Sequence, residues 1–372
     1  MSGRRAVAVV DLGAVERNCA RLASALEGGA RLCAVVKADG YGHGAVECAR
    51  AALAGGASWL AVATAAEAAD LRAALPDARL FVMGALTPEE LDVALQADAD
   101  IAVWRQAFYD LVRERAGAAP APPRLHVKWD TGMGRLGERE AGRALELLAA
   151  VSAAGDVELT GFWTHFATAD EPGSEFFAEQ LARFASVAPR LREEHPGLVL
   201  HAANSAATLI ARASHFDMVR CGIAIYGLDP FQEDPAAHGL EPALALHSYV
   251  ADVKGLEAGE SAGYGRSWRA REATHVGVLP IGYGDGVRRA LSNDADVLVD
   301  GARYPIVGTI SMDNLTIDLG RDPIVTPGAG AVLIGALGDE RILAEELARR
   351  LGTINYEITC GLSARVPREY VR

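Results

Sequence analysis

The sequence lacks any apolar run long enough to cross a membrane. Its 372 residues are 50% hydrophobic, yet no uninterrupted apolar stretch approaches the roughly 20 residues that span a bilayer. The N-terminus, MSGRRAVAVVDL, has two arginines followed by only five apolar residues before Asp11. That run is too short for a secretory signal. We therefore expect a cytoplasmic protein, without a membrane partner, whose chain begins with a β-strand.

Paired cysteines and basic stripes are also missing. The five cysteines contain no CxxC pair, so we expect reduced thiols in or near the core and no metal site. They are Cys19, Cys33, Cys48, Cys221 and Cys360. The net charge is -13 and the basic residues are scattered, which argues against nucleic acid as a partner. The length suffices for one large domain and a smaller one.

Short β-branched runs alternate with Ala-, Leu- and Glu-rich segments in the first two thirds of the chain. This alternation predicts parallel strands joined by right-handed crossovers. Eight strands favour a closed (β/α)8 barrel of the TIM type over an open sheet. The predicted strands are RLCAVV, SWLAVA, RLFVMG, DIAVW, RLHVKWD, VELTGFWTH, LVLHAAN and FDMVRCGIAIYG. The predicted helices cover residues 45–53, 65–75, 88–96, 106–116, 138–154, 174–194 and 205–213.

After Gly239 the strands become frequent and closely spaced, which predicts a mostly β domain. Its predicted strands lie in ALALHSYVADVKGL, HVGVLPIGY, DVLVDGARYPIVG, LTIDLG and GAVLIGAL, and one helix covers residues 343–351. We therefore expect a barrel domain over residues 10–238. A C-terminal β domain would cover residues 239–372 together with an N-terminal strand over residues 1–9.

Polar residues gather where the predicted barrel strands end, and the active site of such a barrel lies at those ends. In chain order they are Lys37 at the end of the first strand, Lys128, Asp130 and Arg135 at the fifth, His165 at the sixth, Asn204 and Ser205 at the seventh, and Arg220, Gly222 and Ile223 at the eighth. A single histidine or arginine in such a place is more often structural, but their convergence favours a site. The loops after strands seven and eight are the usual phosphate site. A phosphate there and a lysine on the first strand predict a phosphorylated aldehyde held as a Schiff base, and pyridoxal 5'-phosphate fits that description.

Nine motifs together resemble the bacterial alanine racemases. The likeness runs from near Val9 to Tyr370. The motifs are VVKADGYGHGA, KWDTGMGRLG, THFATAD, AANSAA, VRCGIAIYG, AGYGRSW, LPIGYGDG, ISMDN and NYEITCGLSARVPREY. The resemblance implies a pyridoxal phosphate barrel with a β domain, working as a head-to-tail homodimer with shared active sites. It implies racemisation of alanine through two bases on a pyridoxal phosphate aldimine, and a supply of D-alanine for peptidoglycan.

The same resemblance assigns roles to residues. Lys37 would form the internal aldimine and act as one base, and Tyr264 from the second subunit would be the other. The remaining assignments are Tyr41, Asn204, Ser205, Gly222, Ile223 and Tyr356 near the cofactor phosphate, Arg135 and His165 around the cofactor, Arg220 at its pyridine nitrogen, Arg135, Met312 and Asp313 near the substrate, and Tyr283 and Tyr356 at the entrance. Lys128 would be carbamylated and paired with Arg135; the alternative is an ordinary lysine neutralised by Asp130.

Two residues depart from the family pattern. Trp129 replaces a small aliphatic residue, and strand alternation predicts that it faces the helices. Asn314 stands where glutamine is common. Within the opening motif, Asp39 and His43 are expected to be loop and surface residues.

Three other functions compete with alanine racemisation. A barrel-type decarboxylase would place an acid at the ring nitrogen, which Arg220 argues against. A non-enzymatic carrier of pyridoxal phosphate would resemble the barrel alone, so the β domain with Tyr264 argues against it. A racemase of another small amino acid, such as serine, stays open.

Overall fold

The computed structural model describes residues 4–372, which divide into two compact units. The barrel unit comprises Val15–Ile225, and the β unit joins the N-terminal segment up to Ala14 with Tyr226–Arg372. Residues 1–3 of the expected N-terminal strand lie outside the described residues. None of the helices in the described part is long and apolar enough to cross a membrane.

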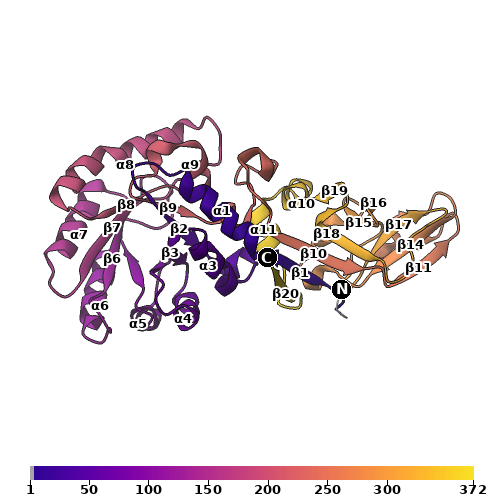
Figure 1. The fold of residues 1–372 in the computed structure, drawn as a ribbon, viewed down its shortest axis with the longest axis horizontal. Coiled ribbons are helices and arrows are strands. Elements are labelled where there is room, and N and C mark those ends of the chain that lie inside the picture. Colours follow the sequence, from indigo (N-terminus) through magenta and orange to yellow (C-terminus); the bar gives the residue numbers. More distant parts are fainter. Residues whose placement is uncertain (1–3) are drawn as a thin grey trace. The chain divides into compact units, whose positions relative to one another are not determined.

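Eight parallel strands, β2 to β9, form a closed barrel in chain order (Figure 1). The barrel closes where β2 pairs with β9, which sets Cys33 beside Arg220. The strands are β2 (Arg31–Val35), β3 (Ala57–Val62), β4 (Leu80–Val82), β5 (Asp100–Val103), β6 (Arg124–Lys128), β7 (Glu158–Trp163), β8 (Val199–His201) and β9 (Met218–Cys221). The predicted eight-stranded α/β barrel is confirmed.

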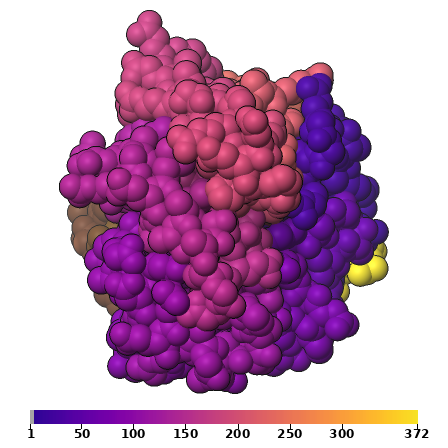
Figure 2. Space-filling model, turned by 90° about the vertical axis from the view of Figure 1, so that its left-hand side faces the viewer, coloured from indigo at the N-terminus to yellow at the C-terminus, as the bar shows by residue number. Residues whose placement is uncertain are grey.

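Helices cover the outside of the barrel strands (Figure 1). In the space-filling view the colours pass in chain order around this face, as expected when each helix follows its strand (Figure 2). The helices are α1 (Leu12–Ser24), α3 (Ala45–Ala54), α4 (Ala65–Ala74), α5 (Pro88–Gln96), α6 (Gln106–Ala116), α7 (Ala141–Ala153), α8 (Glu175–Glu194) and α9 (Ser205–Ile210), and the element labelled α2 (Lys37–Tyr41) is a left-handed turn after β2. The predicted helices at 88–96 and 106–116 agree to the residue, whereas α1 was not predicted.

Local sequence signals explain where several helices begin. The Thr64 and Thr87 side chains each accept a hydrogen bond from the backbone N–H three residues on. The Glu67 and Glu90 carboxylates in turn accept from the backbone N–H groups of these threonines. These reciprocal capping boxes satisfy N–H groups that a helix start leaves open. Asp11 caps the unpredicted α1 by accepting from Ala14 N at 3.0 Å.

Trp129 packs toward the helices, as strand alternation predicts. Its ring lies 6.5 Å from that of Phe184 on α8 and 6.3 Å from that of Phe162 on β7. The indole is 6% exposed. This departure from the family pattern is therefore a core contact between the barrel and its helical layer.

The middle of the barrel is polar rather than wholly apolar. Asp100, His126 and His201 are each 0% exposed. Gly161 on β7 makes room for one of these rings, since a Cβ there would lie 2.1 Å from His126 Nδ1. Glycine within a strand often marks such a close approach.

The β unit is built from three sheets. Its largest sheet has the order β16-β15-β18-β10-β1-β20, with β19 on β18, and the smaller ones are β11-β14-β17 and β12-β13. The N-terminal strand β1 pairs antiparallel with β10 and parallel with β20, so segments from both ends of the chain lie side by side (Figure 1). The strands are β1 (Val7–Asp11), β10 (Leu244–Tyr249), β11 (Asp252–Leu256), β12 (Ser261–Ala262), β13 (Trp268–Arg269), β14 (Thr274–Leu279), β15 (Asp296–Val299), β16 (Ala302–Pro305), β17 (Leu315–Gly320), β18 (Gly330–Leu337), β19 (Glu340–Ile342) and β20 (Arg368–Val371). Two helices, α10 (Ala344–Leu351) and α11 (Asn355–Cys360), accompany them, and α11 was not predicted.

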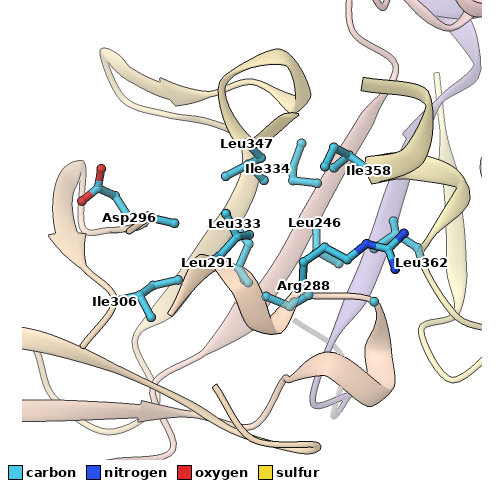
Figure 3. A pocket seen from close by; sticks show the side chains of 13 residues that line it. Leu246, Arg288, Leu291, Asp296, Ile306, Leu333, Ile334, Leu347, Ile358 and Leu362 are labelled. Carbon is cyan, nitrogen blue, oxygen red and sulfur yellow. The ribbon is translucent and has the colours of Figure 1, made fainter. Parts of the chain in front are cut away.

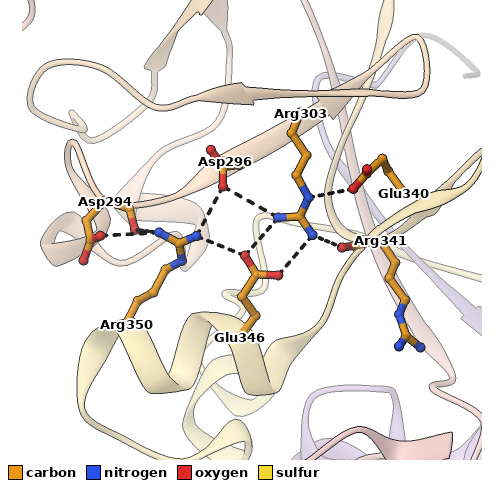
Figure 4. Close-up of polar contacts among 7 residues, drawn as sticks. All are labelled: Asp294, Asp296, Arg303, Glu340, Arg341, Glu346 and Arg350. Carbon is orange, nitrogen blue, oxygen red and sulfur yellow. Dashed lines mark hydrogen bonds and ion pairs between the residues drawn. The ribbon is translucent and has the colours of Figure 1, made fainter.

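A cluster of ion pairs ties α10 to the sheet (Figure 4). Arg303 on β16 pairs with Glu346 at 3.0 Å and with Glu340 at 2.8 Å. Arg350 on α10 pairs with Glu346 and with Asp296, each at 3.2 Å. Isolated surface pairs stabilise little, but partly buried pairs that share carboxylates act as a network.

A small cavity of ≈ 30 Å³ lies inside the β unit (Figure 3). Leu246, Leu291, Leu333, Ile334 and Leu347 line it. Its lining is mostly apolar, with Arg288 and Asp296 as its charged residues.

Replacing Gly161 with Ala should destabilise the barrel unit by roughly 2–4 kcal/mol. The reason is the approach of the new Cβ to His126, which is buried and cannot retreat into solvent. Gly142→Ala is the matched control, because this helical glycine has nothing within 4 Å of a new Cβ, and it should stabilise by about 0.5 kcal/mol. Urea unfolding followed by tryptophan fluorescence measures both. A Gly161→Ala protein as stable as the unaltered one would show that the His126 ring moves freely.

Candidate cofactor-binding site

Cationic side chains collect at the carboxyl end of the barrel. The chain has three lysines, Lys37, Lys128 and Lys254, and the first two lie just after β2 and at the end of β6. Lys128 Nζ lies 4.1 Å from the centroid of the Trp163 ring, and Arg220 Cζ lies 4.8 Å from it. Both cations therefore lie close to the same indole ring. Each is attracted to the ring by a cation–π interaction, but the two positive charges repel one another.

Arg220 is buried and anchored by neutral acceptors. It is 3% exposed. It donates to His201 Nδ1 at 2.9 Å, to the carbonyl oxygens of Thr164 and Ala202 at 2.8 and 3.1 Å, and to His165 Nδ1 at 3.3 Å. Burial lowers the pKa of Arg220 to about 10. A guanidinium held this way keeps one fixed orientation and can only donate.

The two histidines beside Arg220 are held in their neutral form. Burial, and then the charge of Arg220, lower the pKa of His165 and of His201 well below the usual value. His165 follows β7 and is half-buried. Neutral rings can accept from the guanidinium, whereas charged rings would repel it.

A left-handed turn follows Lys37, which corrects the expectation that Lys37 is the last residue of a strand. Strand β2 ends at Val35. Ala38, Asp39 and Tyr41 then have φ values of 52°, 51° and 53°. Non-glycine residues rarely adopt this conformation, so other contacts must hold it. Glu67 supplies one by accepting from Ala38 N at 2.6 Å.

His43 and Asp39 also hold this turn. His43 is 0% exposed and its Nδ1 donates to the carbonyl oxygens of Gly40 and Tyr41, each at 3.1 Å. The prediction that His43 is a surface residue is therefore wrong, because its ring packs into the turn and bonds to these backbone carbonyl oxygens. Asp39 is exposed, and its carboxylate accepts from Ala45 N at 2.9 Å at the start of α3.

Tyr41, Ser205 and Gly222 converge on one place. A Cβ on Gly222 would lie 2.2 Å from the Tyr41 hydroxyl oxygen, so the hydroxyl rests against bare backbone. Ser205 Oγ accepts from Gly222 N at 3.1 Å and from Ala224 N at 3.3 Å. Asn204 caps α9 by accepting from Ala207 N at 3.0 Å. Two hydroxyl groups beside a backbone that only glycine permits form a cradle that suits a phosphate.

Lys128 is almost fully buried and short of negative charge. It is 3% exposed. Burial, followed by the charges of Arg220 and Arg135, lowers its pKa to about 7. The Asp130 carboxylate instead accepts from Gly132 N at 3.0 Å and from Gly134 N at 2.9 Å. Across residues 4–372, Lys128 forms no ion pair with a carboxylate, although the charge of Asp130 opposes the lowering of its pKa.

Sequence reasoning missed the residues that hold the two loops after β6 and β7. Gln180 on α8 is 0% exposed. It donates to Thr131 Oγ1 and to the carbonyl oxygen of His165, each at 3.2 Å. Thr131 and Thr164 also share a hydroxyl contact of 2.8 Å. The signal was a glutamine on the apolar face of a helix, in line with Phe184 and Leu191.

The β unit carries the other predicted site residues on linked loops. Tyr283 N donates to Ser311 O at 3.0 Å, and Ser311 Oγ accepts from Asn314 N at 3.1 Å. The second bond closes a tight turn that presents Met312 and Asp313. Asp313 pairs with Arg365 at 2.6 Å.

Three large side chains stand out from these loops. Tyr264 is 74% exposed, Met312 50% and Tyr283 43%. Tyr264 lies in a short turn whose carbonyl oxygen accepts from Thr309 Oγ1 at 2.9 Å. Tyr356 lies on α11 and is half-buried.

Chemically, the barrel end is suited to an organic anion. Lys37, Lys128, Arg220 and the exposed Arg135 bring positive charge, and the charges of the other three all act on Lys128. The cradle at Gly222 supplies hydroxyl and backbone groups next to them. Lys37 adds an amine that can bond to an aldehyde. The donor set therefore fits pyridoxal phosphate, with its phosphate in the cradle and its aldehyde at the lysine.

Comparison with known proteins agrees with this chemistry. The profile of the alanine racemase N-terminal domain matches residues 10–230, and that of the C-terminal domain matches residues 243–370. The chain belongs to the alanine racemase family. The predicted family is thus confirmed, and with it the enzyme class, an isomerase.

Individual members of the family are similar over their whole length. Alanine racemase of Frankia casuarinae is 41% identical over 373 residues, which is 99% of this chain and 96% of the relative. The crystal structure of alanine racemase from D-cycloserine producing Streptomyces lavendulae has a TM-score of 0.93 and 40% identity, covering 100% of this chain and 98% of that one. The alanine racemase of Bacillus anthracis with bound L-Ala-P has a TM-score of 0.89 and 37% identity, covering 99% and 95%.

Proposed function

We propose that the protein interconverts L-alanine and D-alanine with pyridoxal 5'-phosphate held at the carboxyl end of the barrel. The observation that carries this proposal is the pairing of Lys37 with a buried, donor-only Arg220 at one barrel end. Membership of the alanine racemase family supports it. Support for the cofactor comes from the cradle at Gly222 and the surplus of positive charge.

Each group in the barrel has a proposed task toward the cofactor. Lys37 binds its aldehyde, and Arg135 and His165 lie around its ring. The phosphate is held by Tyr41, Asn204, Ser205, Gly222 and Ile223. The fixed geometry of the Gly222 cradle favours this, because binding groups held in place before a ligand arrives lose little entropy.

Arg220 is proposed to select racemisation over other reactions. When bound, the cofactor withdraws electron density from Cα of the substrate. Arg220 can only donate, so a ring nitrogen facing it has to accept and stays unprotonated. That limits the withdrawal and keeps negative charge at Cα, where a proton then returns. The decarboxylase alternative would need an acid in this position.

Two bases on opposite faces of Cα are needed to invert it directly. We assign one face to the Lys37 amine and the other to the Tyr264 hydroxyl of a second copy. Met312, Asp313 and Tyr283 come from that copy as well, the first two beside the substrate and the last at the entrance. The exposure of three large side chains on linked loops supports a surface that a second copy covers in a homodimer.

The proposed product, D-alanine, suggests a biosynthetic role. D-Alanine is a component of peptidoglycan, so a biosynthetic supply of it is the proposed purpose of the reaction. Substrate strictness depends on the small space that Tyr283 and Tyr356 leave at the entrance. L-Serine is the competing substrate.

We also propose that Lys128 is carbamylated. Its pKa of about 7 leaves much of the amine neutral near neutral pH, and a neutral amine reacts with carbon dioxide to form a carbamate and a proton. The resulting anion would pair with Arg135 and relieve its repulsion by Arg220. The same change would supply the negative charge that the buried site lacks.

The reaction is tested with purified protein and added cofactor. L-Alanine should give D-alanine, and the reverse, at least about tenfold faster than L-serine is converted. Tyr264→Phe should lose roughly 100-fold or more of the interconversion, while Lys37 still exchanges the α-proton of one enantiomer in deuterated water. Tyr304→Phe, also in the β unit, is the control and should behave as the unaltered protein. No D-alanine from L-alanine would overturn the function, and equal loss of exchange from both enantiomers would overturn the two-base assignment.

The carbamate predicts a pH-dependent signal. Protein exposed to isotope-labelled bicarbonate should show one carbamate carbon resonance at about pH 8, which fades as the pH falls through about 7. The sign follows because a pKa lowered by burial keeps the amine neutral above that pH, and protonation below it removes the nucleophile. Lys128→Met should abolish the resonance and Lys254→Met should not. An unmodified Lys128 amine under all these conditions would contradict the proposal.

A further inference from the structure

A continuous line of hydrogen bonds crosses the interior of the barrel. Arg220 NH1 lies 2.9 Å from His201 Nδ1, and His201 Nε2 lies 2.8 Å from His126 Nδ1. His126 Nε2 lies 3.0 Å from Asp100 Oδ2. Asp100 is the first residue of β5, whereas His201 is the last of β8. The line therefore joins the amino end of the barrel to the end that carries the candidate site.

The donors and acceptors along this line allow only one direction. Arg220 can only donate, so His201 Nδ1 must accept and His201 Nε2 must carry the proton. His126 Nδ1 then accepts, and His126 Nε2 donates to Asp100. An ionised carboxylate only accepts, so both ends of the line demand the same arrangement of protons.

The charge states agree with that direction. Burial lowers the pKa of His126 against the opposing effect of Asp100, and it lowers the pKa of His201 well below the usual value. Both rings are therefore neutral, with one proton each. Although burial raises the pKa of Asp100, hydrogen bonds from His126 and Arg79 bring it below its usual value, so the carboxylate is ionised.

Packing against aromatic neighbours fixes the planes of the two rings. His201 stacks on Trp163 with a centroid separation of 5.5 Å and an interplanar angle of 3°. His126 lies 4.4 Å from the ring centroid of Phe81. Gly161 provides the space for His126, as described above. Rings held in fixed planes keep their hydrogen bonds in one geometry. Hydrogen bonds in such a chain polarise one another.

The line also joins Arg220, whose hydrogen-bond acceptors are neutral, to Asp100, which two arginines hold. Arg220 contacts neutral acceptors, and within residues 4–372 no carboxylate pairs with it. At the other end Arg79 Nη2 and Arg124 Nε donate to Asp100 at 2.9 and 2.7 Å. The Asp100 carboxylate is thus held in place by Arg79 and Arg124 while it accepts the hydrogen bond from His126.

We propose that Asp100 is a positioning residue for the reaction, acting on Arg220 through His126 and His201. It fixes both imidazoles as Nε2–H tautomers, makes His201 Nδ1 a stronger acceptor, and so holds the guanidinium in its donor-only orientation. This inference rests on the proposed role of Arg220 toward the cofactor ring. The predicted Nε2–H tautomers of His126 and His201 do not depend on that role.

The first test uses the unaltered protein, with and without the cofactor. Imidazole nitrogen chemical shifts of isotope-labelled protein report the tautomer of each ring, and spectra of His126→Phe and His201→Phe assign the signals. His126 and His201 should both be neutral Nε2–H tautomers. An Nδ1–H tautomer or a doubly protonated ring at either position would overturn the proposal, whatever the activity.

The second test asks whether Asp100 acts through His126. Asp100→Asn should lower the rate of racemisation roughly 3- to 10-fold, the size of one ordinary hydrogen bond, with little change in KM. Pyruvate released per D-alanine formed should rise, because a less firmly held Arg220 no longer keeps the ring nitrogen unprotonated. Asp98→Asn is the matched control, since Asp98 also pairs with Arg124, at 2.8 Å, but lies outside the line.

A double substitution separates positioning from simple stability. In a His126→Phe background, Asp100→Asn should change neither the rate nor the pyruvate ratio further. Additive effects would show that Asp100 acts by another route and would overturn the proposal. Failure of the proposed function is distinct, because a protein without racemase activity would still show the two tautomers.

Discussion

The burial of Arg220 is the constraint on which the barrel unit depends. A guanidinium at 3% exposure costs several kcal/mol unless its donors are satisfied. The chain satisfies them with two neutral imidazoles and two carbonyl oxygens rather than with a carboxylate. A carboxylate beside Arg220 would bind it more strongly but would cancel the charge needed at the site. The polar interior is related to this arrangement, because His201 bonds to Arg220 and to His126. Trp163 stacks on His201, and Gly161 leaves room for His126.

The same constraint explains why the carboxyl end of the barrel is electrostatically incomplete. Lys128 has a pKa of about 7 because burial and neighbouring cations oppose its charge, and the one nearby carboxylate, Asp130, caps a loop. A site with this surplus of positive charge favours an anionic ligand. Violations of ordinary packing rules are expected where a ligand completes the structure. The strained turn after Lys37 is a second violation at the same place, and Glu67 and His43 hold it.

Much of this was predictable from sequence, and the failures have physical causes. The eight strands and the boundaries of α5 and α6 follow from local hydrophobic periodicity, to which α5 adds a capping box at Thr87. The strand-end residues could be grouped because a parallel barrel brings its carboxyl ends together. His43 could not be placed, since its burial depends on a left-handed turn that alternating glycines only permit. Asp100, His126 and His201 come from three separate strands, and their alignment depends on barrel register. Helix α11 is six residues long, too short for a periodic signal.

Lys37 is the residue to which we propose that the cofactor binds covalently. Borohydride reduction of the protein with bound pyridoxal phosphate fixes that bond, and peptide mapping then locates it. Only three lysines compete, and Lys128 and Lys254 serve as internal controls. We expect one modified peptide, containing Lys37. Modification of Lys128 or Lys254, or of no lysine at all, would contradict it.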